Sequence, residues 1–167
     1  PGYLASLRTR TQLAQLRQLF LMLWLVPPVL LGVLAFMMTG DPVSTELVVA
    51  SAVLAAVAAF AARSVLFAGK PLPLDSSGTA VEPATIAVQA LEELRQRLLS
   101  SFAVAEAGLL IGVVLAILSG NPAPYLAAVV ISWPALVLNG PPQRTIERIR
   151  VKLEAAGRPS YLWEALT

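Results

Sequence analysis

The sequence predicts an all-α, polytopic membrane protein with four transmembrane helices, arranged as two hairpins that repeat one another. Of its 167 residues, 57% are hydrophobic and only 13% are charged, whereas a soluble domain usually carries about a quarter charged residues. The charges cluster at the ends of long uncharged segments. The segments between these clusters are long enough to cross a bilayer, which takes about 20 apolar residues each.

The turns between the apolar segments are short and have a defined chemistry. Gly40-Asp41-Pro42 follows the first segment and Gly120-Asn121-Pro122 follows the third. Gly permits a positive φ, Asp and Asn cap helices, and Pro ends or begins a helix. We therefore predict spans at residues 19–39, 47–67, 99–119 and 125–138, the last of which is short and needs tilt or flanking residues to cross.

The distribution of positive charge predicts the orientation of these spans. All twelve Lys and Arg residues fall in the N-terminal arm, the central segment, the C-terminal tail or, for Arg63, near the inner end of the second span. The two short turns carry only Asp41 and Glu46. Because Lys and Arg favour cytoplasmic loops, we expect a multi-pass protein with both termini on the cytoplasmic or equivalent side. This topology accounts for the net charge of +2, which is no indication of nucleic-acid binding.

An internal repeat is visible at an offset of 80 residues. Residues 32–42 align with 112–122, so that Gly32 meets Gly112 and the two Gly-Asx-Pro turns coincide. Any two apolar hairpins share some Gly and Pro residues at their turns, but the matched glycine eight residues before each turn favours duplication. Both halves begin inside, so the repeat would be parallel, unlike the inverted repeats of many alternating-access transporters.

The spans and the repeat divide the chain into six parts. They are a basic N-terminal helix (1–18), a first transmembrane hairpin (19–68), a flexible Pro/Ser/Gly linker (69–81), a cytoplasmic amphipathic helix (82–98), a second transmembrane hairpin (99–140), and an amphipathic C-terminal helix and tail (141–167).

Two amphipathic helices are expected at the inner face. The C-terminal one places Ile146, Ile149 and Leu153 on one side and basic residues on another. Such helices lie on, or emerge from, a membrane surface. Binding to anionic lipid or to a partner subunit would explain them, as would an ordinary membrane-anchoring flank. The candidate inner-surface or lipid contacts are Arg95, Arg97, Arg144, Arg148 and Lys152.

Rows of small residues predict close helix packing. In lipid, helices associate through close backbone approach rather than through the hydrophobic effect. The sequence leaves open whether these rows pack on each other or on another protein. The rows are Gly108, Gly112, Ala116 and Gly120 in the third span, and Ser51, Ala55 and Ala59 in the second.

One carboxylate, Glu106, falls inside the third span. It lies roughly 13 Å from Arg97 and 21 Å from Gly120 along the helix, and points about 120° away from the small-residue row. An ionised carboxylate is expensive in a bilayer. We expect a pair with Arg63 or a hydrogen bond to a nearby serine or partner subunit. A proton or cation site, or pairing with a ligand or another chain, are the alternatives.

The residue inventory limits the chemistry. There is no His and no Cys, which excludes disulfides, Cys/His metal sites and Ser-His or Cys-His catalysis. The chain also has no phosphate-binding loop, dinucleotide fingerprint or nucleophile elbow. We therefore expect no enzymatic activity, no metal site and no cofactor.

The leading interpretation is a non-catalytic accessory, assembly or scaffold subunit of a larger integral membrane complex. Its small-residue faces and basic inner-surface helices would contact other membrane-protein subunits or further copies of itself, together with the lipid bilayer and without nucleic acid. The alternative is a small homo-oligomeric ion or proton transporter or channel that uses Glu106.

Overall fold

The computed structural model describes residues 12–38, 42–68, 82–157 and 159–166. Every element in these ranges is helical, which confirms the all-α prediction. Most of the predicted N-terminal helix (1–18), the first Gly-Asx pair and the linker 69–81 lie outside the described residues. The elements are α2 (Gln12–Met37), α3 (Thr45–Phe67), α4 (Pro83–Ser119), α5 (Ala123–Leu138), α6 (Gln143–Leu153), the 3₁₀ helix η1 (Glu154–Ala156) and α7 (Leu162–Leu166).

Three of the described helices, α2, α3 and α4, are long and apolar enough to cross a membrane. α5 has 16 residues and reaches that length only together with α6, from which it bends by 63°. Many large side chains on the outside of the bundle are apolar, including Phe36, Phe60 and Leu118. These features are those of an integral membrane protein whose outer surface faces lipid.

The helix ends follow from local chemistry. Ser44 caps α3 by accepting a hydrogen bond from the Leu47 N–H, and Pro83 occupies the first turn of α4. Gly120 ends α4 in the left-handed region, at φ 64°, where glycine carries no steric penalty. The Asn121 Oδ1 then accepts from the Ala123 N–H at 2.8 Å and leads into α5. The predicted Gly-Asn-Pro turn is therefore confirmed.

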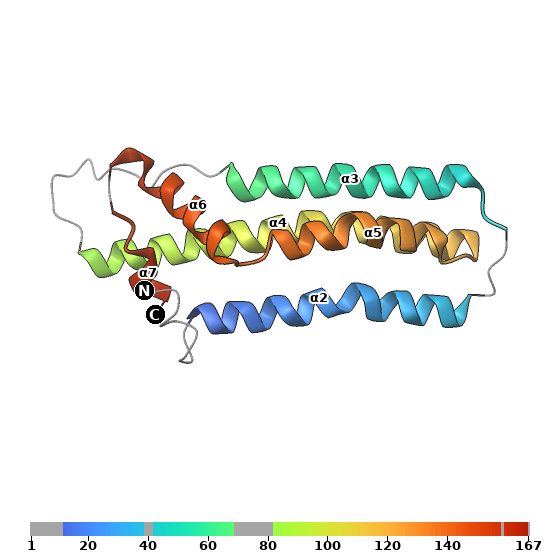
Figure 1. Cartoon of the computed structure of the whole chain (residues 1–167), viewed down its shortest axis with the longest axis horizontal. Coiled ribbons are helices and arrows are strands. Elements are labelled where there is room, and N and C mark those ends of the chain that lie inside the picture. The colour runs from blue at the N-terminus through green and yellow to red at the C-terminus, as the bar shows by residue number, and fades with distance from the viewer. Residues whose placement is uncertain (1–11, 39–41, 69–81, 158, 167) are drawn as a thin grey trace.

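α4 is the central helix and is longer than predicted. Its 37 residues span about 55 Å at 1.5 Å per residue, well beyond a hydrocarbon layer of about 30 Å. The helix runs through Leu98 without a break, so the predicted amphipathic segment is the extension of the third span. In Figure 1 this extension projects past the end of α3 on the side where α6 and α7 lie.

The two predicted hairpins pack differently. α3 contacts both α4 and α5, and these two also contact each other, whereas α2 contacts mainly α5. Figure 1 shows α2 and α3 on opposite sides of the α4–α5 pair. Gly112 is packed tightly between helices, whereas a Cβ added to its repeat partner Gly32 would have no atom within 4 Å. The structure thus leaves the two-hairpin repeat unconfirmed.

The C-terminal helices fold back on α4 and form what we call the base: residues 83–98 of α4 together with α6 and α7. Ile146, Ile149 and Leu153 of α6 are fully buried, as are Leu162 and Leu166 of α7. The apolar face of α6 therefore covers protein rather than lipid. Its basic face remains exposed at the end of the bundle.

Candidate functional site

The predicted small-residue rows meet inside the chain itself. A Cβ placed on Gly108 would lie 2.9 Å from the Ala58 Cβ and 3.2 Å from the Ala55 Cα. A Cβ on Gly112 would lie 2.6 Å from the Ala128 Cβ. Both contacts are closer than side chains tolerate, so these glycines allow α4 to approach α3 and α5 directly.

The remaining members of the rows lie along the same contact, with two exceptions. Ser51, Ala55 and Ala116 are fully buried, and the Ser51 hydroxyl donates to the Pro124 carbonyl of α5 at 2.7 Å. Ala59 is partly buried, and Gly120 serves the turn rather than the packing face. The structure therefore answers what the sequence left open: these rows pack on each other.

Glu106 is partly buried on a different side of α4. One turn earlier on that side, the Phe102 ring packs edge-on against Phe20 of α2, with centroids 5.8 Å apart. Among the described residues Glu106 makes no hydrogen bond and no ion pair. The carboxylate thus lies on the side of α4 that faces α2, and no cation in the described part of the chain forms an ion pair with it.

The predicted pair of Glu106 with Arg63 is wrong. Arg63 is exposed on α3, one turn before Phe67 at the end of the helix, and its guanidinium lies 5.7 Å from the centroid of the Phe67 ring. It faces the basic side of α6 instead of α4. In the sequence both residues fall in the inner part of their spans, but depth in the membrane alone does not fix the direction in which each side chain points.

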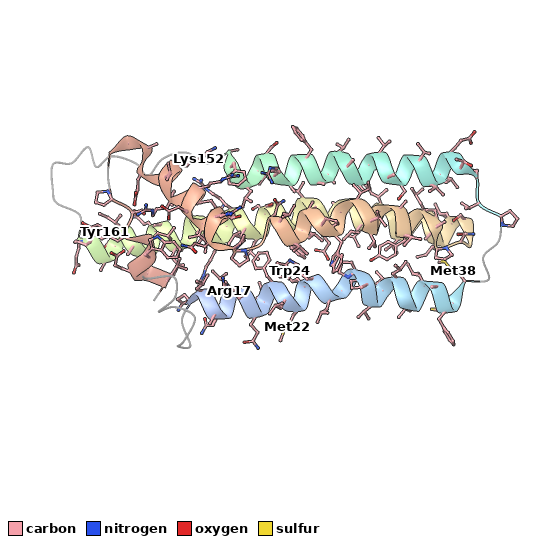
Figure 2. The ribbon with its side chains drawn as sticks, viewed as in Figure 1. Arg17, Met22, Trp24, Met38, Lys152 and Tyr161 are labelled. Atoms are coloured by element: carbon pink, nitrogen blue, oxygen red, sulfur yellow. The ribbon has the colours of Figure 1, made fainter. Side chains whose placement is uncertain are left out.

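The basic residues predicted as surface contacts divide into two groups. Arg97 is only 4% exposed and its Nε donates to Glu93 at 2.8 Å, so it belongs to the interior of the base and is not a lipid contact. Arg95 donates to the Gln12 side chain of α2. Arg144, Arg148 and Lys152 are exposed on α6, and the Lys152 ammonium donates to the Phe67 carbonyl at the end of α3 (Figure 2).

Two hydrogen bonds that attach α2 to α5 were not foreseen from the sequence. The Tyr125 hydroxyl donates to the Pro27 carbonyl at 3.1 Å, and the Trp133 indole N–H donates to the Trp24 carbonyl at 3.0 Å. Pro28 has no N–H, so the Trp24 carbonyl lacks its usual donor within the helix. The signal in the sequence is the Pro27-Pro28 pair, because a proline inside a helix leaves one carbonyl of the preceding turn without a donor. Trp24 projects from α2 toward α5, while Met22 points away (Figure 2).

No cluster of three potential metal-ligating side chains occurs in the part of the chain that the structure describes. No family model, curated protein or solved structure matches the chain. The features of the structure that bear on function are Glu106, the packing of the bundle and the exposed basic side of α6.

Proposed function

We propose that this chain is a non-catalytic accessory or assembly subunit of a larger integral membrane complex. The observation that carries the proposal is Glu106, a carboxylate within a membrane span that has no counter-charge among the described residues. A charged side chain in the bilayer is costly unless it is paired or hydrated. A cationic side chain from a second membrane protein would remove that cost.

The contact surface for such a partner is the side of α4 that carries Glu106. Leu110, one turn further along α4, is 56% exposed on this side, and Ala103 is exposed next to it. The small-residue rows are already occupied within the chain. A partner helix would therefore approach α4 beside α2, where the apolar surface and the carboxylate are both accessible.

The orientation of the chain in this proposal follows from its charges. The described basic residues cluster toward the base: Arg17 lies near Pro142, Arg63 lies near α6, and Arg95 and Arg97 belong to α4 within the base. By the positive-inside rule, the base and both termini face the cytoplasm or the equivalent compartment. Glu106 then lies in the inner half of the bilayer.

Ion or proton transport by a homo-oligomer is the second candidate, and it rests on the same carboxylate. A single copy offers little space for a pathway between α3, α4 and α5, because the contacts at Gly108 and Gly112 are already tight. A pathway would have to form between copies, lined on one side by Glu106.

The test is purification from the native membrane in a mild detergent, with stoichiometry determined by mass spectrometry. We compare wild type with Glu106→Gln, and use Glu92→Gln, an exposed carboxylate in the base, as the matched control. The proposal predicts a second membrane protein in fixed ratio, lost in Glu106→Gln and retained in Glu92→Gln. A lone homo-oligomer that takes up protons in liposomes, and stops doing so in Glu106→Gln, would replace it with the transport alternative.

A further inference from the structure

A groove of about 900 Å³ lies between the last turn of α3 and the exposed side of α6. Four cationic side chains line it: Arg63 from α3, and Arg144, Arg148 and Lys152 from α6. These residues are 81 or more positions apart between the two helices, so the fold and not the local sequence brings them together. The groove is lined by residues from the end of α3 and from α6, and Figure 1 shows α6 bent away from the direction of α5 at this end of the molecule.

The positive charges in the groove are crowded around one ring. The Arg63 guanidinium carbon and the Lys152 ammonium nitrogen each lie 5.7 Å from the centroid of Phe67. The Phe67 ring stabilises both cations in part, and the Phe67 carbonyl accepts a hydrogen bond from Lys152. Arg144 and Arg148 make no hydrogen bond or ion pair among the described residues. Like charges at this spacing repel one another, so an anion in the groove would lower the energy.

Among the described residues that line the groove, Glu147 is the one carboxylate, and it does not neutralise the four cations. Its Oε1 accepts from Arg150 at 2.5 Å, and its Oε2 accepts from the Trp163 indole N–H at 3.3 Å. Both carboxylate oxygens of Glu147 thus bind groups of α6 and α7, and the described lining of the groove keeps a net positive charge.

The first turn of α6 adds to the attraction for an anion. Gln143 and Arg144 begin this 11-residue helix and line the groove, and Pro142, at the capping position, provides no side-chain cap. The Thr145 and Ile146 N–H groups donate to the Pro142 carbonyl, so the N–H groups of Gln143 and Arg144 are the first-turn donors left to face an anion, at the positive end of the helix dipole. Such a turn favours phosphate groups.

An apolar path leads from the bilayer into the groove. Val53, Ala56 and Phe60 are exposed on α3 at helical spacing, and Arg63 and Phe67 continue the same row. Phe60, the last apolar residue of this row before Arg63, is 76% exposed. A molecule with an anionic head and an acyl tail would lie with its head among the cations and its tail along this row.

We propose that this groove is a binding site for the headgroup of an anionic phospholipid of the inner leaflet. The phosphate is held by Arg63, Arg144, Arg148 and Lys152, and an acyl chain runs along the α3 row that ends at Phe60. The lipid site lies on α3 and α6, away from Glu106. It therefore does not depend on whether a partner subunit binds beside Glu106.

The experiment is a lipid titration of the full chain in detergent, followed by native mass spectrometry with phosphatidylglycerol and phosphatidylcholine as the probes. Wild type is compared with the double variant Arg144→Gln/Arg148→Gln, whose residues make no ion pair that the fold requires. Arg95→Gln, which removes a cation from the same end of the molecule but outside the groove, is the control.

We expect wild type and Arg95→Gln to bind phosphatidylglycerol in preference to phosphatidylcholine. The double variant should bind phosphatidylglycerol at least about tenfold more weakly, because each basic residue near an anionic lipid surface adds to the attraction. Its thermal stability without lipid should be equal to or above that of wild type, since repulsion is relieved. Equal affinity of the double variant and wild type would overturn the proposal.

A second measurement separates the lipid from its phosphate alone. Thermal stability is recorded with inorganic phosphate and with phosphatidylglycerol at matched phosphate concentration. The lipid should stabilise wild type more than a Phe60→Ala variant, because the acyl chain contacts Phe60 in the proposed site. If inorganic phosphate stabilises the protein as strongly as the lipid does, the groove is a free-phosphate site and the lipid assignment is wrong.

Discussion

The Trp133 indole N–H donates a hydrogen bond of 3.0 Å to the Trp24 carbonyl, the one carbonyl of α2 that the ring of Pro28 leaves without its helical donor. In a bilayer no water is at hand to satisfy such a carbonyl. A proline that weakens one helix thus creates an acceptor that attaches this helix to another. Together with the bond from Tyr125 to Pro27, it holds α2 against α5.

The first prediction tests this coupling. Trp133→Phe removes the donor and should lower the free energy of unfolding by about 1 kcal/mol. The same substitution in a Pro28→Ala background should cost less, because an alanine at position 28 supplies the N–H that satisfies Trp24 within α2. The measurement is a double-mutant cycle from unfolding titrations in mixed micelles. Additive effects of the two substitutions would show that the bond does not depend on the proline.

The second prediction concerns the two glycines that the internal repeat aligns. Gly112→Ala should destabilise the bundle by about 1–3 kcal/mol, because its Cβ would meet the Ala128 Cβ at 2.6 Å. Gly32→Ala meets nothing within 4 Å, so it should be neutral or stabilising by up to about 1 kcal/mol through helix propensity. Comparison of the two unfolding midpoints is the check, and equal effects would contradict the packing described for α4.

The third prediction addresses the buried cation of the base. Glu93→Gln removes the charge facing Arg97, which is almost wholly buried. Because Glu93 is partly exposed, the loss should be about 1–2 kcal/mol, below the cost of breaking a fully buried pair. Glu92→Gln, an exposed neighbour, should change stability by less than about 0.5 kcal/mol. Thermal unfolding of both variants measures the difference, and a cost as large for Glu92→Gln as for Glu93→Gln would contradict it.

The fourth prediction asks whether α6 packs on protein or lies on lipid. Ile149→Ala should cost about 2–4 kcal/mol, since Ile149 is fully buried in the base. Val151→Ala, on a side chain that is 59% exposed, should be close to neutral. Both variants are compared by thermal unfolding in detergent without added lipid. If neither changes the unfolding temperature, α6 is not packed against α4 in solution.

The fold could be predicted as far as local sequence signals determine it. The apolar segments and the Gly120-Asn121-Pro122 turn gave the helices and the tight connection between α4 and α5, because hydropathy and turn chemistry depend on neighbouring residues. The arrangement of the helices could not be read in this way. The repeat suggests equal hairpins, yet the residues around Gly32 and Gly112 differ, and these partners decide which helices approach closely.

The candidate sites were predictable in part for a similar reason. Glu106 stood out because a carboxylate is rare within an apolar segment. The grouping of Arg63 with Arg148 and Lys152 arises from the 63° bend between α5 and α6, which no periodicity shows. The burial of Arg97 was missed because it depends on α6 and α7 folding back over α4.

The most direct test of the proposed function is site-specific photo-crosslinking in the native membrane from position 110, one turn from Glu106 on the exposed side of α4. Position 57 in α3, an exposed position on another helix of the bundle, is the control. The proposal predicts that position 110 labels one other membrane protein, in a span that carries Lys or Arg, and that Glu106→Gln abolishes the label while position 57 gives lipid adducts alone. Labelling only of lipid or of further copies of this chain from position 110 would contradict it.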